Sequence, residues 1–135
     1  MVDVIARQTE QFSEVVLLGH SGGGALALLI AEQLPKVQAV VTVAGNIDTE
    51  AWTQYHGYTP LYGSLNPAKR NPLPASIRQL HLVGARDTNI PPSLTRAWIE
   101  NQPAASLREI PDNTHMCCWQ KDWSAVLQWI AAQKS

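Results

Sequence analysis

The sequence lacks the features of several large classes of protein. Its 10 basic and 11 acidic residues give a formal net charge of −1, so no basic field is available to hold a nucleic-acid backbone. Its longest apolar run, residues 25–31, is much shorter than the roughly 20 residues that span a membrane. We therefore expect neither a nucleic-acid partner nor a membrane span.

Cysteine is also scarce, and its placement excludes one further class. The two cysteines, Cys117 and Cys118, are adjacent and cannot form the disulfide framework of a small secreted domain, although their redox state stays open. With 8 glycines and 9 prolines among 135 residues, the chain is neither collagen-like nor of low complexity. Its length suits one compact domain and is too short for two, so we treat residues 1–135 as a single domain.

Apolar segments with β character alternate with helical segments along the chain. The predicted strands are 15–18, 37–44, 77–83 and 107–110, and the predicted helices are 1–12, 22–34, 93–101 and 121–133. Strands that alternate with helices form a parallel sheet covered on both faces. The sequence therefore predicts an α/β fold with three layers, in which helices flank a mainly parallel sheet of about four strands.

One motif in this pattern carries chemistry. Residues 19–23 read G-H-S-G-G, which matches G-x-S-x-G, and they lie between a predicted buried strand and an apolar helix. This is the setting of a nucleophile elbow, in which the serine occupies a strained turn and glycines let the turn close. The N–H of Gly22 would then stabilise an anion formed at Ser21. The alternative is a glycine-rich turn for close packing or phosphate binding, but the P-loop and dinucleotide-binding patterns are absent.

A nucleophilic serine needs a base, and the base needs an orienting acid. Asp87 follows the third predicted strand and His115 follows the fourth, so both are expected at strand carboxyl ends, where parallel sheets bind ligands. We interpret Ser21, Asp87 and His115 as a catalytic triad. The alternatives are a turn or helix-capping role for Asp87, a surface loop position for His115, and Asp48 as a rival acid.

The other histidines have no comparable pattern. His20 lies in the elbow turn and is expected to pack there or support the site, whereas His56 and His81 receive no assigned role. No pair of histidines has metal-ligand spacing with a third ligand nearby, so no metal site is expected.

With these residues in this order, the chain resembles the α/β-hydrolase superfamily, specifically its esterase-like and lipase-like serine hydrolases. The matching residues are 15–24, the Gly84-Ala85-Arg86-Asp87 turn with Ile90-Pro91 after it, and His115 before a tryptophan-containing helix. The three motifs occur in the order typical of the family.

The resemblance implies a function and a role for each site residue. Ser21 would be the nucleophile, Asp87 the orienting acid, His115 the general base and Gly22 one oxyanion donor. The implied activity is hydrolysis of carboxylic esters or related acyl compounds through an acyl-enzyme, with a small-molecule acyl substrate and no cofactor. Thioesterase, peptidase and acyltransferase chemistry use the same residues and stay open.

The chain departs from the family pattern at its beginning. Family members place several strands, and a second oxyanion donor, before the elbow strand, whereas one predicted helix precedes it here. The chain is therefore expected to be a truncated domain that matches the C-terminal half of the fold. The alternative function is a catalytically impaired fragment that persists by self-association. No signal peptide is recognisable at Met1, but a targeting signal could be missing from a truncated chain. The location therefore stays open, with the cytoplasm as the default.

The departure also leaves an edge open. The strand from Val15 to Leu18 would lose its outer neighbour, and it contains no lysine or proline that would block pairing. This predicts a homodimer formed through that edge. The alternative is that the helix at 1–12 covers the edge.

Residues 46–75, rich in proline and aromatic residues, are expected to be irregular and to form a lid or cap. The expected substrate-pocket residues are His20, Trp52, Tyr55, Tyr58 and Tyr62. The alternative is a packed surface loop whose aromatic side chains fill the core.

Overall fold

The computed structural model describes residues 1–132, which form four strands, five α-helices and two short 3₁₀ helices. The strands are β1 (Val15–His20), β2 (Val37–Val43), β3 (Arg78–Gly84) and β4 (Ala105–Ile110). The α-helices are α1 (Val2–Gln8), α2 (Gly22–Ala31), α3 (Thr49–His56), α4 (Pro92–Ile99) and α5 (Trp123–Ala131). The 3₁₀ helices are η1 (Pro67–Lys69) and η2 (Trp119–Asp122).

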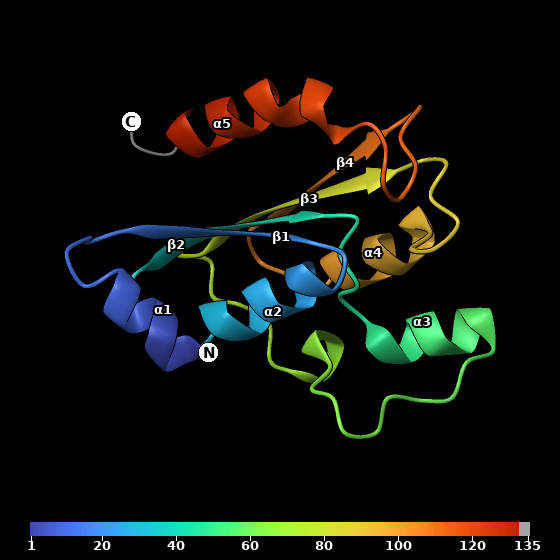
Figure 1. Cartoon of the computed structure of the whole chain (residues 1–135), viewed down its shortest axis with the longest axis horizontal. Coiled ribbons are helices and arrows are strands. Elements are labelled where there is room, and N and C mark those ends of the chain that lie inside the picture. Colours follow the sequence, from blue (N-terminus) through green and yellow to red (C-terminus); the bar gives the residue numbers. More distant parts are fainter. Residues whose placement is uncertain (133–135) are drawn as a thin grey trace.

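The four strands form one parallel sheet in the order β1-β2-β3-β4, which confirms the predicted fold class. The two central strands are buried almost throughout, as expected for strands covered on both faces. The edge strands β1 and β4 are more exposed. Because all strands run in the same direction, the residues that follow β1, β3 and β4 emerge at the same end of the sheet, at the carboxyl ends of the strands (Figure 1).

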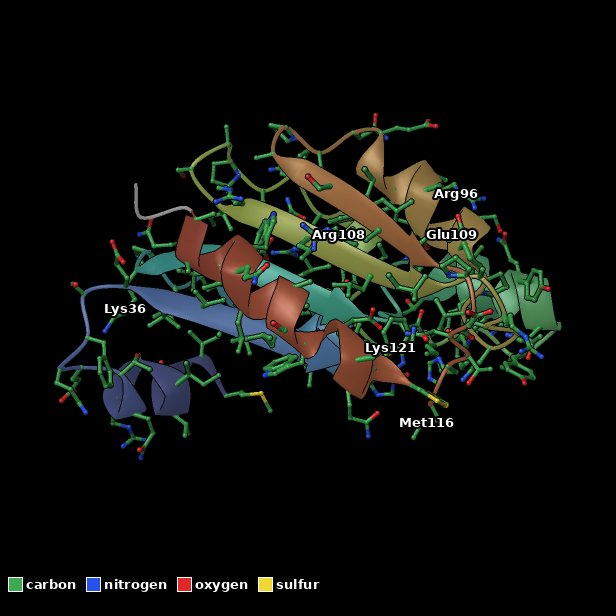
Figure 2. All side chains as sticks on the ribbon, turned by 90° about the horizontal axis from the view of Figure 1, so that it is seen from above. Lys36, Arg96, Arg108, Glu109, Met116 and Lys121 are labelled. Carbon is green, nitrogen blue, oxygen red and sulfur yellow. A yellow bond between two sulfur atoms is a disulfide. The ribbon has the colours of Figure 1, made fainter. Side chains whose placement is uncertain are left out.

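Helices cover both faces of the sheet and complete the three predicted layers. In Figure 1, α5 lies on one face, whereas α1, α2 and α4 lie on the other. On the α2 face the core includes Leu28, Ile30 and Val40, and on the α5 face Val126 packs against Leu80. Seen from above, α5 runs obliquely across the strands (Figure 2). Within residues 1–132 no helix combines the length and the apolar character needed to cross a membrane.

Several element bounds differ from the sequence-based expectations. Helix α2 ends at Ala31 rather than at Leu34, where Pro35 disfavours helical backbone. The expected helix at 121–133 begins as η2 and continues as α5, and its last expected residue, Gln133, lies outside the described residues.

Residues 46–75 are less irregular than expected, because they contain α3 and η1. Asp48 caps α3, since its Oδ1 accepts a hydrogen bond from the Ala51 N–H at 3.1 Å and another from the Asn66 side chain at 3.1 Å. Gly57 ends the helix with a left-handed φ of 69°. The segment is thus held by specific polar contacts at both ends of α3.

A chain of polar side chains, buried except for the half-buried Gln102, lies under α4. Thr42 Oγ1 is 2.7 Å from His81 Nδ1, His81 Nε2 is 3.0 Å from Gln79 Oε1, and Gln79 Nε2 is 3.0 Å from Gln102 Oε1. The Trp98 ring meets the His81 ring edge-on, with centroids 5.0 Å apart. Burial lowers the pKa of His81 to about 3, so its imidazole is neutral in the folded chain at neutral pH.

Candidate active site

Ser21 occupies the sharp turn between β1 and α2. Its backbone has φ 54° and ψ −122°, a conformation that residues other than glycine rarely adopt. The turn is fixed by hydrogen bonds: the Ser21 N–H donates to the Val43 carbonyl, and the Ser21 carbonyl accepts from the N–H groups of Gly24 and Asn46, each at 3.0 Å. The strained serine is therefore held by the end of the neighbouring strand, β2.

Two glycines make this turn possible. A Cβ on Gly19 would lie 2.0 Å from the Gly23 carbonyl oxygen, so no larger residue fits where β1 meets α2. A Cβ on Gly24 would lie 2.9 Å from the Gly45 Cα, which shows how closely α2 approaches the residues after β2. A Cβ on Gly23 would meet nothing within 4 Å. The first glycine of the motif is therefore required sterically, whereas the second is not.

His115 connects Ser21 with Asp87. Its Nε2 lies 3.0 Å from Ser21 Oγ, and its Nδ1 lies 3.0 Å from Asp87 Oδ2. A carboxylate only accepts hydrogen bonds, so Nδ1 carries a proton and Nε2 of the neutral ring is free to accept from the serine hydroxyl. The structure thus brings together three residues that the sequence places 66 and 28 positions apart (87 − 21 and 115 − 87).

Asp87 is fixed by its own loop. Its Oδ1 accepts hydrogen bonds from the N–H groups of Asn89 and Ile90, both at 2.8 Å, and its side chain is fully buried. Oδ2 therefore remains for His115. The rival acid, Asp48, caps α3 instead, and Asp87 is the carboxylate that contacts His115.

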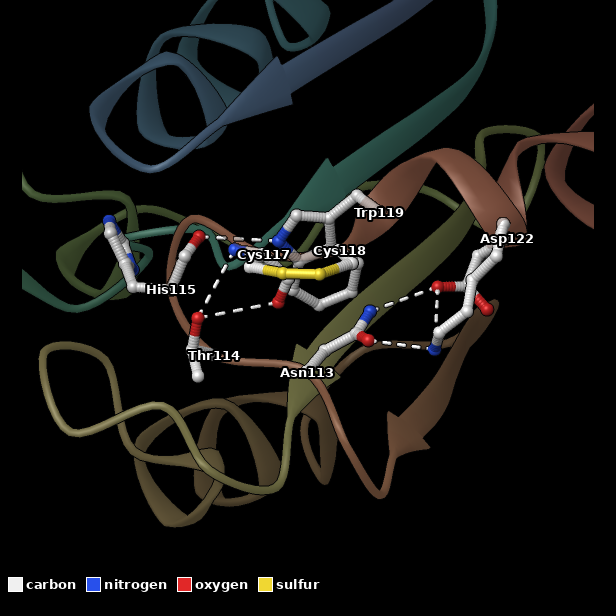
Figure 3. Close-up of a disulfide and its surroundings, with 8 residues drawn as sticks. Asn113, Thr114, His115, Cys117, Cys118, Trp119 and Asp122 are labelled. Atoms are coloured by element: carbon white, nitrogen blue, oxygen red, sulfur yellow. Dashed lines mark hydrogen bonds and ion pairs between the residues drawn. A yellow bond between two sulfur atoms is a disulfide. The ribbon is translucent and has the colours of Figure 1, made fainter.

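The loop that carries His115 is closed by a buried asparagine. Asn113 receives a hydrogen bond from Lys121 at 2.7 Å and donates one to Asp122 at 2.9 Å, as Figure 3 shows. A Cβ on Gly84 would lie 2.4 Å from the Asn113 carbonyl oxygen, so β3 ends in direct contact with this loop. The sequence does not predict these contacts, because none of the residues belongs to a recognisable motif.

The carbonyl of His115 is held from two sides. It lies 2.9 Å from His20 Nε2 and 3.2 Å from Trp119 Nε1, and both groups donate to it. His20 therefore supports the residue that contacts the serine.

Cys117 and Cys118, whose redox state the sequence left open, form a disulfide within the same loop (Figure 3).

The expected substrate-pocket residues do not gather at one place. His20 lines a largely apolar pocket of about 520 Å³ beside α5, together with Met116, which Figure 2 places beyond the carboxyl ends of the strands. The four aromatic residues expected with His20 do not line it. Trp52 and Tyr58 pack on each other, Tyr55 packs on His56, and Tyr62 is 88% exposed.

The N–H of Gly22 is at the first position of α2 and has no hydrogen-bond partner among residues 1–132. The same part of the chain contains no group of three His, Cys, Asp or Glu side chains that could hold a metal ion.

Comparisons with known proteins agree with this architecture. The chain matches no protein-family model and no curated protein. It is similar to the solved structure of an α/β-hydrolase enzyme from the metagenome of sediments of the lagoon of Mar Chica, Morocco, with 23% identity and a TM-score of 0.69, over 99% of this chain and 71% of that chain.

Two further solved structures are similar over nearly the whole chain. One is the monoacylglycerol lipase of Paleococcus ferrophilus, with 16% identity and a TM-score of 0.67, over 97% of this chain and 74% of that one. The other is the esterase domain of a Rhodothermus marinus protein, with 16% identity and a TM-score of 0.73, over 98% and 66%. The chain spans between 66% and 74% of the length of these three structures. Residues 1–132 therefore have the fold of the α/β-hydrolases, over part of the length of those proteins.

Proposed function

We propose that the chain carries the catalytic residues of a serine hydrolase that acts on carboxylic esters or related acyl compounds. The observation that supports this most directly is the hydrogen-bonded series Ser21 Oγ, His115 and Asp87, with 3.0 Å at each step. The esterase and lipase among the similar structures fit this substrate class. The strained φ of Ser21 fits a nucleophile that must project from its turn.

The proposed reaction proceeds in two steps. As Ser21 Oγ attacks the acyl carbon, His115 Nε2 takes the hydroxyl proton and then gives it to the leaving alcohol, which leaves an acyl-enzyme. Water then loses a proton to His115 and attacks the acyl carbon, the bond to Ser21 Oγ breaks, and the proton returns to Ser21. Asp87 keeps the His115 ring in the productive tautomer and stabilises its charged form.

The Gly22 N–H supplies one donor for the oxyanion in this proposal. Its position at the start of α2 adds the positive end of the helix dipole. Loss of one oxyanion donor typically costs about 10²–10³ in turnover, so turnover is expected to depend strongly on this N–H.

A fluorophosphonate probe, followed by intact-mass measurement, tests the proposal. We expect one equivalent of label on the wild-type chain and none on Ser21→Ala, because the probe reacts with an activated serine. Ser64→Ala, at an exposed serine away from the site, is the matched control and is expected to label like wild type. Label on Ser21→Ala, or no label on the wild-type chain, would contradict the proposal.

A second candidate function rests on the open edge of β1. This strand pairs with β2 on one side and has no strand partner on the other within residues 1–132, and its Leu18 is 42% exposed. In this alternative the chain is a catalytically impaired fragment that persists by self-association. A self-associating chain without labelling at Ser21 would favour it over the hydrolase.

A further inference from the structure

We propose that Trp52 and His56, on α3, are positioning residues for the carboxylate of Asp87. They act on it through the peptide group between Asn89 and Ile90. This inference rests on the proposed function for its kinetic consequences, but its structural consequence can be measured without any activity.

Two side chains of α3 contact the Asn89 carbonyl. Trp52 Nε1 donates to the Asn89 carbonyl oxygen at 3.1 Å and lies 3.2 Å from Asn89 Oδ1. His56 Nε2 lies 2.7 Å from the same carbonyl oxygen. A carbonyl oxygen only accepts, so His56 Nε2 carries a proton and donates it. Both donors therefore fix the direction of this C=O group.

The same peptide group reaches Asp87 from its other end. The C=O of Asn89 and the N–H of Ile90 belong to one planar unit, so a fixed C=O direction also fixes the N–H direction. The Ile90 N–H donates to Asp87 Oδ1 at 2.8 Å, and the Asn89 N–H donates to the same oxygen at 2.8 Å. A rotation of this peptide plane would withdraw a donor from the carboxylate. Trp52 and His56 oppose that rotation.

The two donors are themselves held by aromatic packing. The His56 ring stacks on Tyr58 with centroids 4.9 Å apart and an interplanar angle of 11°, and it meets the Trp52 ring edge-on at 5.7 Å. Tyr55 closes the cluster with an edge-on contact to His56 at 4.9 Å. Three of the aromatic residues expected in a substrate pocket, Trp52, Tyr55 and Tyr58, thus pack with His56 in one cluster that holds the two donors.

The chemical consequence concerns the second oxygen of Asp87. With Oδ1 anchored by two N–H groups, Oδ2 faces His115 Nδ1 at 3.0 Å. If the anchor loosens, the carboxylate turns, and His115 loses its fixed orientation toward Ser21. Because Trp52 and His56 contact the Asn89 carbonyl and would act on His115 through Asp87, we expect the chemical step to slow while substrate binding is unchanged.

The variants separate the donated N–H groups from the bulk of the rings. Trp52→Phe removes the indole N–H and keeps an aromatic ring, His56→Leu removes the second donor, and His56→Gln replaces it with an amide N–H. Gln54→Ala, at an exposed residue of the same helix, is the matched control. Thermal unfolding of each variant shows that the chain is folded, and the single variants remain informative if the double variant is not.

Two measurements test the inference. Hydrogen exchange of the Ile90 amide, followed by NMR, is expected to accelerate at least about tenfold in Trp52→Phe/His56→Leu and to return toward wild type in Trp52→Phe/His56→Gln, with β3 amides unchanged. On a short-chain nitrophenyl ester, kcat of the first double variant is expected to fall about 10- to 100-fold at an unchanged KM. Gln54→Ala should match wild type in both measurements.

Unchanged Ile90 exchange in Trp52→Phe/His56→Leu would overturn the inference. A rise in KM at constant kcat would also overturn it, because these side chains would then contact the substrate. A wild-type chain that fails to label at Ser21 would contradict the proposed function, and the Ile90 exchange would still decide whether α3 braces Asp87.

Discussion

At the scale of the residue, the buried His81 makes stability depend on pH. Burial lowers its pKa from 6.5 to about 3, so the unfolded chain binds a proton in a range where the folded chain does not. Above about pH 6.5 the imidazole is neutral in both states, so its titration does not lower the stability of the fold. As the pH drops from there toward 3, the free energy of unfolding falls by at most about 1.4 kcal/mol per pH unit. Urea unfolding at a series of pH values in this range measures the slope.

His81→Gln is expected to flatten this dependence, because it removes the titrating group and keeps a polar side chain. His56→Gln serves as the control, since His56 is a half-buried histidine outside the polar chain under α4. Equal slopes in wild type and His81→Gln would show that other groups cause the acid sensitivity.

At this scale the sequence predicted residues that come into contact better than it predicted the residues that hold them in place. The order of Ser21, Asp87 and His115 along the chain, each after a predicted strand, was sufficient to select the three that the structure brings into contact. Neither Asn113 nor Trp119 could be selected, because their roles depend on side-chain geometry within a loop that no motif describes.

At the scale of the element, apolar runs predicted the strands and most helices, but α3 was missed. A continuous apolar face is the signal for a packed helix, and the mixed polar and aromatic residues of α3 do not form one. The helix depends instead on its cap, Asp48, on Gly57 at its end, and on contacts with Asn89. Contacts between segments this far apart in sequence are not visible in local patterns.

Removing the cap is therefore expected to loosen α3. Asp48→Ala deletes the oxygen that accepts from Ala51 and from the Asn66 side chain, and we expect a loss of about 1 kcal/mol with faster exchange of the Ala51 amide. Asp48→Asn keeps an acceptor oxygen and should lose less. An Ala51 amide that exchanges equally in all three chains would contradict the assigned capping role.

At the scale of the whole molecule, the outer edge of β1 has no strand partner within residues 1–132. Helix α1 packs with Val2 and Ile5 against the core on the α2 face and provides no strand for the outer edge of β1. Trp123, at the start of α5, is exposed and lines the same pocket as His20, and Leu18 of β1 is exposed as well. An unpaired strand next to apolar side chains is a surface on which another chain can add.

This surface predicts a dimer in solution. Sedimentation across a dilution series is expected to show a monomer–dimer equilibrium, and Leu18→Lys is expected to shift it to monomer because a charge is placed beside the pairing edge. Leu61→Lys, at a residue of similar exposure outside the sheet, is the control. A wild-type chain that stays monomeric at the highest concentrations would rule out the dimer.

In the chain of polar side chains under α4, the donor and the acceptor of each hydrogen bond can be assigned. The Leu73 N–H donates to Gln102 Oε1 at 3.2 Å, so this atom must be the amide oxygen, and the group that reaches it from Gln79 must be the NH₂. Gln79 then turns its oxygen to His81, whose Nε2 holds the proton and whose Nδ1 accepts from the Thr42 hydroxyl. Every donor is thus oriented by the one before it. The tautomer of a histidine in the centre of the sheet is set by a main-chain N–H in the connection that leads into β3.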